Sequence, residues 1–174
     1  MDCVNSLRCV AAVAAATCFL PATPSWPADV RQYSSPDGQL RARIGFSKNS
    51  PTATPESRVT ISAGAKVVFE RSYESEDGEH GFGVERAAWT PDSRFLVFSL
   101  SSSGGHQAWH FPTDFWCRAD ARVRRLDDYI GPITSAEFSV SRPDVVTTEG
   151  RKDDLEEAEL RASLRTLLEP RGKR

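Results

Sequence analysis

Two histidines and an aspartate lie at equal intervals in one short stretch of the chain. His106 and His110 are four residues apart, and Asp114 follows after four more. Histidine and aspartate side chains are common metal ligands, so these three could serve a metal-dependent hydrolase. The glycines at 104–105 and Pro112 disfavour a helix, which would place the two histidines on adjacent turns. We therefore keep this hydrolase as the alternative function, and we expect neither a bound metal nor a cofactor.

The same stretch, HQAWHFPTDFWC at positions 106–117, is rich in aromatic side chains. Flat rings bury a large area at a small cost in conformational entropy, which suits contacts with sugars, peptides or other proteins. Large aromatic residues also dominate protein cores, so core packing is the competing interpretation. The residues that we nominate as a binding site are Trp109, His110, Phe111, Phe115 and Trp116.

Two further segments contain side chains that could do chemistry, but neither has a pattern that predicts it. The serine-rich segment Ser99–Ser103 has no base at a spacing typical of a nucleophile and its partner. The acidic segment Glu74–Gly83 lacks the twelve-residue EF-hand pattern, so we expect a solvated loop there. No catalytic residue is predicted, and a non-enzymatic protein is favoured.

Apolar residues at alternating positions predict that β-strands carry these candidate residues. Leu40, Ala42, Ile44 and Phe46 would line one face of a strand, and the segment 58–73 is predicted to form a hairpin with Gly64 in its turn. The strand from Arg94 to Leu100 is apolar on both faces, so we expect it to be covered on both sides. Further strands are predicted over 121–126, 133–140 and 145–148.

The C-terminal segment has a different pattern, which predicts one amphipathic helix over residues 151–170. Asp153 and Glu156 fit a capping box at the start of a helix. An apolar stripe at helical spacing follows, made of Leu160, Leu164, Leu167 and Leu168. Pro170 would end the helix, and residues 171–174 would form a basic tail.

The N-terminal residues 1–28 predict export. Residues 9–20 form a run of twelve without a charge, too short for a hydrocarbon core that needs roughly twenty, but typical of a signal peptide. We therefore expect a periplasmic or secreted protein without a transmembrane span. The sequence AATC ending at Cys18 loosely resembles a bacterial lipoprotein box but misses two of its preferences, so we expect no lipid anchor at Cys18.

Charge and composition restrict the class of partner. The chain has 22 basic and 24 acidic residues, and no block of like charge stands out. A nucleic-acid surface normally needs a basic stripe, so we expect no nucleic-acid partner. The partner we expect is another protein or a component of the cell envelope.

A turn motif recurs along the chain and carries a family resemblance. The segment WTPDSRFLVF at 89–98 resembles the repeat of WD-repeat-like β-propellers of the TolB type, which reads aromatic-Ser/Thr-Pro-Asp-Gly/Ser-x-hydrophobic. SSPDGQL at 34–40 is a partial copy, and AEFSVSRPDVVTTE at 136–149 is a degenerate one. Pro36 and Pro91 are 55 residues apart, close to the length of a propeller blade with long loops. The resemblance implies blade-like hairpins, and because the motif is architectural it implies no catalytic residue.

Two or three blades are too few for a closed ring, which typically needs at least about four. The chain could be a fragment, could close a ring with other subunits, or could pack its hairpins as an open sheet or sandwich. We favour the last arrangement. The predicted fold is therefore mainly β, with antiparallel hairpins at residues 29–150 in an open or sandwich-like, propeller-blade-like arrangement and one C-terminal α-helix.

Overall fold

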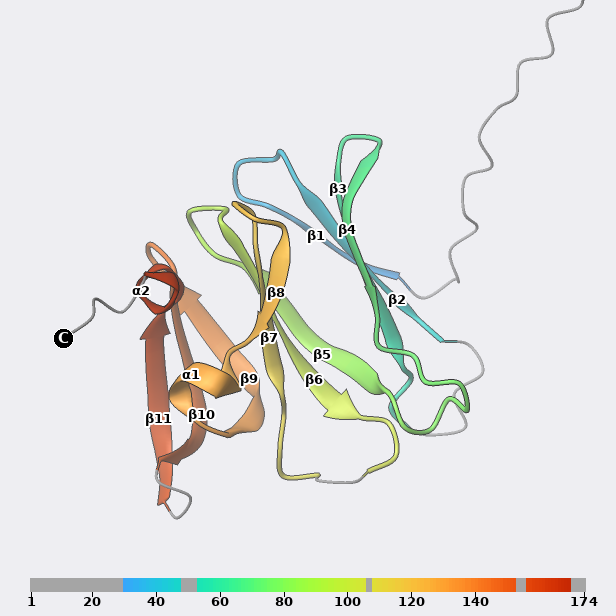
Figure 1. Cartoon of the computed structure of the whole chain (residues 1–174), viewed down its shortest axis with the longest axis vertical. Helices are drawn as coiled ribbons and strands as arrows, with labels where there is room; N and C mark the ends of the chain where they lie inside the picture. The colour runs from blue at the N-terminus through green and yellow to red at the C-terminus, as the bar shows by residue number, and fades with distance from the viewer. Residues whose placement is uncertain (1–29, 48–52, 106–107, 153–155, 170–174) are drawn as a thin grey trace, which may run out of the picture.

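The fold is mainly β and is built from three antiparallel sheets that lie side by side (Figure 1), as the strand pattern predicts. The computed structural model describes residues 30–47, 53–105, 108–152 and 156–169. These residues form eleven strands and two short helices. The arrangement of the described strands is open, because no sheet closes on itself.

Each sheet is formed by strands that are consecutive in the chain. The first sheet contains β1 (Val30–Ser34), β2 (Arg41–Phe46), β3 (Ser57–Ala63) and β4 (Lys66–Ser72). The second contains β5 (Phe82–Trp89), β6 (Phe95–Ser102), β7 (Thr113–Cys117) and β8 (Arg122–Arg125). The third contains β9 (Ile133–Ser141), β10 (Val145–Lys152) and β11 (Glu156–Ser163). The helices are α1 (Asp127–Ile130), before the third sheet, and α2 (Leu164–Leu168), after it.

The middle sheet separates two hydrophobic cores, and β6 contributes to both. Leu96, Phe98 and Leu100 pack in the core shared with the first sheet. Phe95 and Val97 pack in the core shared with the third sheet. All five side chains are at most 3% exposed. The prediction of a strand covered on both sides is therefore confirmed, and its cause is the position of β6 inside the middle of three layers.

The first strands of neighbouring sheets lie against one another, with β5 packed on β1 on one side and on β9 on the other. The two short helices belong to the second core. Leu164 of α2 is fully buried in this core, and Tyr129 and Ile130 of α1 pack against the core. Burial of apolar side chains in these two interfaces provides the main force that holds the layers together.

The two Pro-Asp turns before β2 and β6 have the same hydrogen-bond network. In the first, the Ser35 hydroxyl donates to Asp37 Oδ1 at 2.6 Å and accepts from the amide of Leu40 at 3.0 Å. In the second, Thr90 and Asp92 are joined at 2.7 Å, and Thr90 Oγ1 accepts from the amide of Phe95 at 3.1 Å. The repeat recognised in the sequence is therefore a repeat of local structure, because the same hydroxyl and carboxylate organise both bends.

Contacts between turns also repeat from sheet to sheet. The amide of Asp37 donates to Ser93 Oγ at 3.0 Å, and the amide of Asp92 donates to the carbonyl of Pro143 at 3.3 Å. Asp37 also forms an ion pair at 2.5 Å with Arg118, which follows β7, the third strand of the second sheet. Asp92 forms one at 3.6 Å with Arg165, which follows β11, the third strand of the third sheet. These polar contacts fix the register between layers at the end of the molecule where the turns lie.

The hydrogen bond from Ser35 and the contact with Arg118 lower the pKa of Asp37 to about 2. A carboxylate that accepts several hydrogen bonds is favoured in its charged form, so this turn keeps its network across the physiological pH range.

The prediction of a helix over 151–170 is wrong for most of the segment. Residues Glu156–Ser163 form strand β11, paired with β10, and only Leu164–Leu168 are helical. Leu160 and Ala162 are buried at alternating positions, and pairing with β10 supplies backbone hydrogen bonds that an isolated helix would not make with that strand. The leucines at helical spacing are divided between the strand and the helix. Asp153 of the predicted capping box lies outside the described residues.

The predicted leader over residues 1–28, with Cys18, also lies outside the described residues. Among the residues that the structure does describe, none of the helices has the length and apolar character needed to cross a membrane.

A buried carboxylate anchors the acidic loop between β4 and β5. Glu56 is 1% exposed and accepts from the amide and hydroxyl of Ser75, both at 2.7 Å, from the amide of Gly81 at 2.6 Å and from the hydroxyl of Ser103 at 2.8 Å. A Cβ on Gly81 would lie 2.5 Å from the Glu56 carboxyl carbon, so the close approach requires glycine. The conformation of the acidic loop is therefore stabilised by hydrogen bonds to the buried Glu56 carboxylate.

Replacing Glu56 with glutamine is expected to lower the free energy of unfolding by roughly 2–3 kcal/mol at pH 7, because the amide group cannot accept from the same four donors. Urea titration monitored by circular dichroism measures the loss. Glu70→Gln serves as the matched control. Glu70 is exposed, and its one ion pair with a described residue is to Arg58 at 3.7 Å, so its substitution should change stability by less than about 0.5 kcal/mol. Equal effects of the two substitutions would contradict the anchoring role.

The same carboxylate makes stability depend on pH. Burial alone would raise the pKa of Glu56, but the hydrogen bonds from Ser75, Ser103 and Gly81 outweigh it and hold the pKa below its usual 4.5. The lowered pKa in the folded state means that the stabilisation is present above pH 4.5 and is lost as the pH falls further. Acid titration of Glu56→Gln should therefore show a weaker loss of stability than titration of the unsubstituted protein.

Candidate functional site

The aromatic stretch divides into a buried half on β7 and a surface half before it, in which Trp109 is exposed and His110 and Phe111 are partly buried. Phe115 and Trp116 lie on β7, where they are 0% and 1% exposed. Phe115 belongs to the core with the third sheet, and Trp116 belongs to the core with the first sheet, with its ring 6.0 Å from Trp89. Their nomination as binding residues is corrected, because β7 lies inside the middle layer and both of its faces are covered.

The surface half precedes β7 on the connection from β6, at the end of the molecule opposite the Pro-Asp turns (Figure 1). Trp109 is 47% exposed. Its ring stacks on the ring of His110 at a centroid distance of 5.3 Å and an angle of 27°. The guanidinium of Arg151, from β10, lies 5.0 Å from the Trp109 ring centroid. We refer to Trp109, His110, Phe111 and Arg151 as the Trp109 surface.

Polar contacts hold this surface in place. His110 Nε2 lies 2.7 Å from Asp127 Oδ1 at the start of α1. The other oxygen of Asp127 accepts from the amide of Thr113 at 2.9 Å, and the amide of Phe111 donates to the carbonyl of Ile133 at 2.9 Å. His110 is therefore oriented by a carboxylate that is itself fixed to the start of β7. An exposed tryptophan stacked on such a ring has little freedom to lose on binding.

A hollow of about 400 Å³ adjoins the Trp109 surface. His110 and Phe111 line one part of it, and Glu85 and Ser101, whose side chains are hydrogen-bonded to each other, line another. The hollow therefore combines an aromatic wall with a carboxylate, as a groove for a polar chain segment would.

His110 and Asp114, the two described residues of the alternative hydrolase site, have different partners. Asp114 is 1% exposed and accepts from Arg125 Nε and from the Tyr73 hydroxyl, both at 2.6 Å. His110 pairs with Asp127 instead, and His106 lies outside the described residues. Across the ranges that the structure describes, no three His, Cys, Asp or Glu side chains are grouped so as to hold a metal ion.

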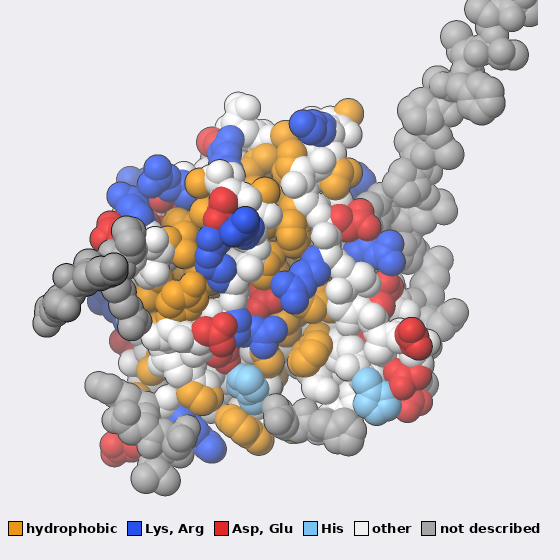
Figure 2. Space-filling view, in the orientation of Figure 1, with side chains coloured by type: hydrophobic (Ala, Val, Ile, Leu, Met, Phe, Trp, Pro, Cys, Tyr) orange, Lys and Arg blue, Asp and Glu red, His pale blue; other side chains and the backbone are white. Residues whose placement is uncertain are grey.

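The Asp114 cluster is a buried polar network that the sequence pattern did not reveal. It joins the first sheet to the second near their outer margins, where basic side chains gather between β4 and β8 (Figure 2). Arg71 of β4 lies 3.9 Å from the carboxylate on which Tyr73 and Arg125 converge. Burial, together with the neighbouring Asp114 charge, raises the pKa of Tyr73 well above its usual value. The tyrosine therefore stays a hydrogen-bond donor at all physiological pH values.

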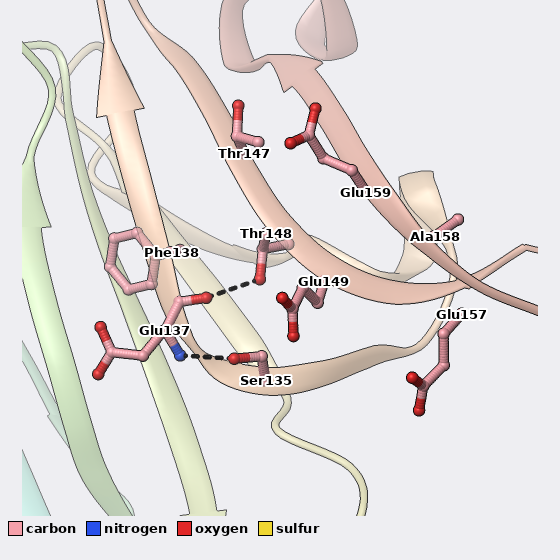
Figure 3. Close-up of a pocket in the computed structure, with 9 residues that line it drawn as sticks. All are labelled: Ser135, Glu137, Phe138, Thr147, Thr148, Glu149, Glu157, Ala158 and Glu159. Carbon is pink, nitrogen blue, oxygen red and sulfur yellow. Dashed lines mark hydrogen bonds between the residues drawn. The ribbon is translucent and has the colours of Figure 1, made fainter.

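A second hollow, of about 470 Å³, lies on the third sheet (Figure 3). Four glutamates line it, but their carboxylates do not converge on a common point. The hydrogen bonds drawn there, from Thr148 to the carbonyl of Glu137 and from the amide of Glu137 to Ser135, are internal to the sheet. None of the residues nominated from the sequence lies in this hollow.

No family model, curated protein or solved structure matches this chain.

Proposed function

We propose that the protein is an exported, non-enzymatic β-rich binding module that contacts another protein or a cell-envelope component through the Trp109 surface. The observation that carries this proposal is the exposure of Trp109. Among the described residues it is one of two large hydrophobic side chains that are exposed, and the other is Val67 at 53%. Trp109 differs from Val67 in being fixed by an aromatic ring and a guanidinium.

The composition of the Trp109 surface favours a protein partner. Tryptophan and arginine are the residue types most enriched among the side chains that dominate binding energy in protein interfaces. Trp109 and Arg151 are already in contact, and His110 is held by Asp127, so a partner would meet an ordered surface. The adjoining hollow offers a place for one side chain of the partner.

The family resemblance and the leader support the rest of the proposal. The matching networks of the two Pro-Asp turns support a relation to the blades of TolB-type propellers, since the motif residues play the same part in both turns. The uncharged run at 9–20 supports export to the periplasm or the medium. We propose no catalytic residue, because the nominated histidine and aspartate lie in separate clusters.

Affinity capture from envelope extract tests the proposal. The unsubstituted protein, Trp109→Ala and Val67→Ala are immobilised at equal density, and recovered proteins are compared. We expect a partner that is retained by the unsubstituted protein and by Val67→Ala but is depleted at least about tenfold by Trp109→Ala. Equal recovery by all three would contradict the Trp109 surface, because Val67 is the matched exposed hydrophobic residue.

A further inference from the structure

The third sheet has three described strands where the other two sheets have four, and its third strand forms an open edge. The third strands of the first and second sheets, β3 and β7, are each paired with a fourth strand, β4 and β8. β11 is the corresponding strand of the third sheet, and among the described residues it pairs only with β10. It forms the left-hand margin of the molecule in Figure 1. An unpaired strand of this length presents backbone groups that can pair with another chain.

The side chains of β11 alternate between the core and the outer face of the sheet. Leu160 packs in the second core, and Ala162, two residues further along the strand, is also buried; both are at most 8% exposed. Glu157, Glu159 and Arg161 occupy the opposite face and are exposed. None of these three forms an ion pair with another described residue.

One cross-strand pair in the third sheet is unfavourable within a single copy of the chain. Glu159 lies directly opposite Glu149 of β10 in the sheet register. Both are exposed on the outer face, and like charges at directly opposite positions destabilise a sheet. A positive charge placed beside Glu159 along the open edge would offset this repulsion.

We propose that the open edge of β11 pairs with β11 of a second copy of this chain, antiparallel, about a two-fold axis at Leu160. In this register Glu159 lies opposite Arg161 of the second copy, and the symmetry creates the same pair again. Ala158 lies opposite Ala162, so core-facing residues meet core-facing residues. The ladder would run over residues 157–163 of each copy and end where α2 begins at Leu164.

Charge selects this register over its neighbours. Any alternative register must keep each side chain on its own face of the sheet, so the pairing can change only in steps of two residues. An axis at Glu159 would place the two copies of Glu159 opposite each other, and an axis at Arg161 would do the same with the two arginines. Of these three axes, only the one at Leu160 places opposite charges in the two pairs beside it, Glu159 with Arg161 and its symmetry mate. The resulting dimer joins two three-stranded sheets into one sheet of six strands.

The dimer goes beyond the proposed binding function and does not depend on it. Each dimer would carry two copies of the Trp109 surface, so a partner with repeated sites would be held more tightly than by one copy. The two ideas are tested separately, because charge changes on β11 leave Trp109 and His110 unaltered.

Charge exchange across the edge tests the dimer. The full chain is compared with Glu159→Arg, Arg161→Glu and the double variant carrying both, by size-exclusion chromatography with light scattering over a concentration series. Each single reversal replaces two attractive pairs with two repulsive ones and should weaken the dimer about tenfold or more. The double variant restores both pairs with the charges exchanged and should recover the dimer. Glu79→Arg, on the exposed loop after β4, should remain dimeric.

Circular dichroism establishes that each variant is folded, and Glu159→Gln and Arg161→Gln replace the reversals if either impairs folding, with a weaker effect in the same direction. A protein that is monomeric at its highest soluble concentration would overturn the proposal. An assembly that survives both single reversals, or a double variant that stays monomeric, would also overturn it.

Discussion

Replacing Trp116 with alanine is expected to lower the free energy of unfolding by about 3–5 kcal/mol, the usual cost of removing a buried tryptophan. Trp116 is 1% exposed, and its ring packs against those of Trp89 at 6.0 Å and Phe69 at 6.2 Å. The cavity would open between the first and second sheets, where the flanking strands cannot collapse without breaking their ladders. Denaturant titration followed by far-UV circular dichroism measures the loss.

Trp109→Ala is the matched comparison for this experiment, because it removes the same side chain from the same stretch of sequence. Trp109 is 47% exposed, so its removal should change stability by less than about 1 kcal/mol. Similar destabilisation by the two substitutions would show that the aromatic stretch is not divided into a core half and a surface half.

The second large effect is expected from Asp114→Ala, which should lower the free energy of unfolding by about 3 kcal/mol at pH 7. The substitution leaves the Tyr73 hydroxyl and the Arg125 guanidinium without their acceptor. Arg125 is 30% exposed, and partial hydration keeps the loss at the lower end of the range for a broken buried pair. Thermal and urea unfolding both report this value.

Asp128→Ala is the control for this substitution, because Asp128 is an exposed residue of α1 and lies outside the cluster. Its removal should cost less than about 0.5 kcal/mol. A further variant, Tyr73→Phe, should cost roughly 1 kcal/mol through the loss of one hydrogen bond. If Asp114→Ala were as stable as Asp128→Ala, the cluster would not join the first two sheets.

Local patterns in the sequence were enough to predict several strands of the first two sheets and both Pro-Asp turns. Alternation at 40–46 predicts β2, and the apolar run after the second Pro-Asp turn predicts the doubly covered β6. These features depend on side chains only a few residues apart, such as Thr90 and Asp92, so the sequence alone contains them.

Features that depend on distant partners could not be predicted in the same way. Leu160 and Leu164 fit a helical stripe equally well, and only the neighbouring strand β10 decides that the first of them belongs to a strand. Trp109 and Trp116 have the same chemistry, and only their place relative to the middle sheet separates surface from core. Glu56 and Asp114 find hydrogen-bond donors across loops and sheets, and no spacing in the sequence indicates these pairings.

Site-specific photo-crosslinking tests most directly the claim that the Trp109 surface makes the functional contact. A photoreactive phenylalanine derivative replaces Trp109 in one protein and Val67, the other exposed large hydrophobic residue, in a second. Both are irradiated in envelope extract and their adducts are compared by mass. We predict a defined adduct from position 109 that is missing from position 67. Equal labelling from the two positions, or an adduct from position 67 alone, would contradict it.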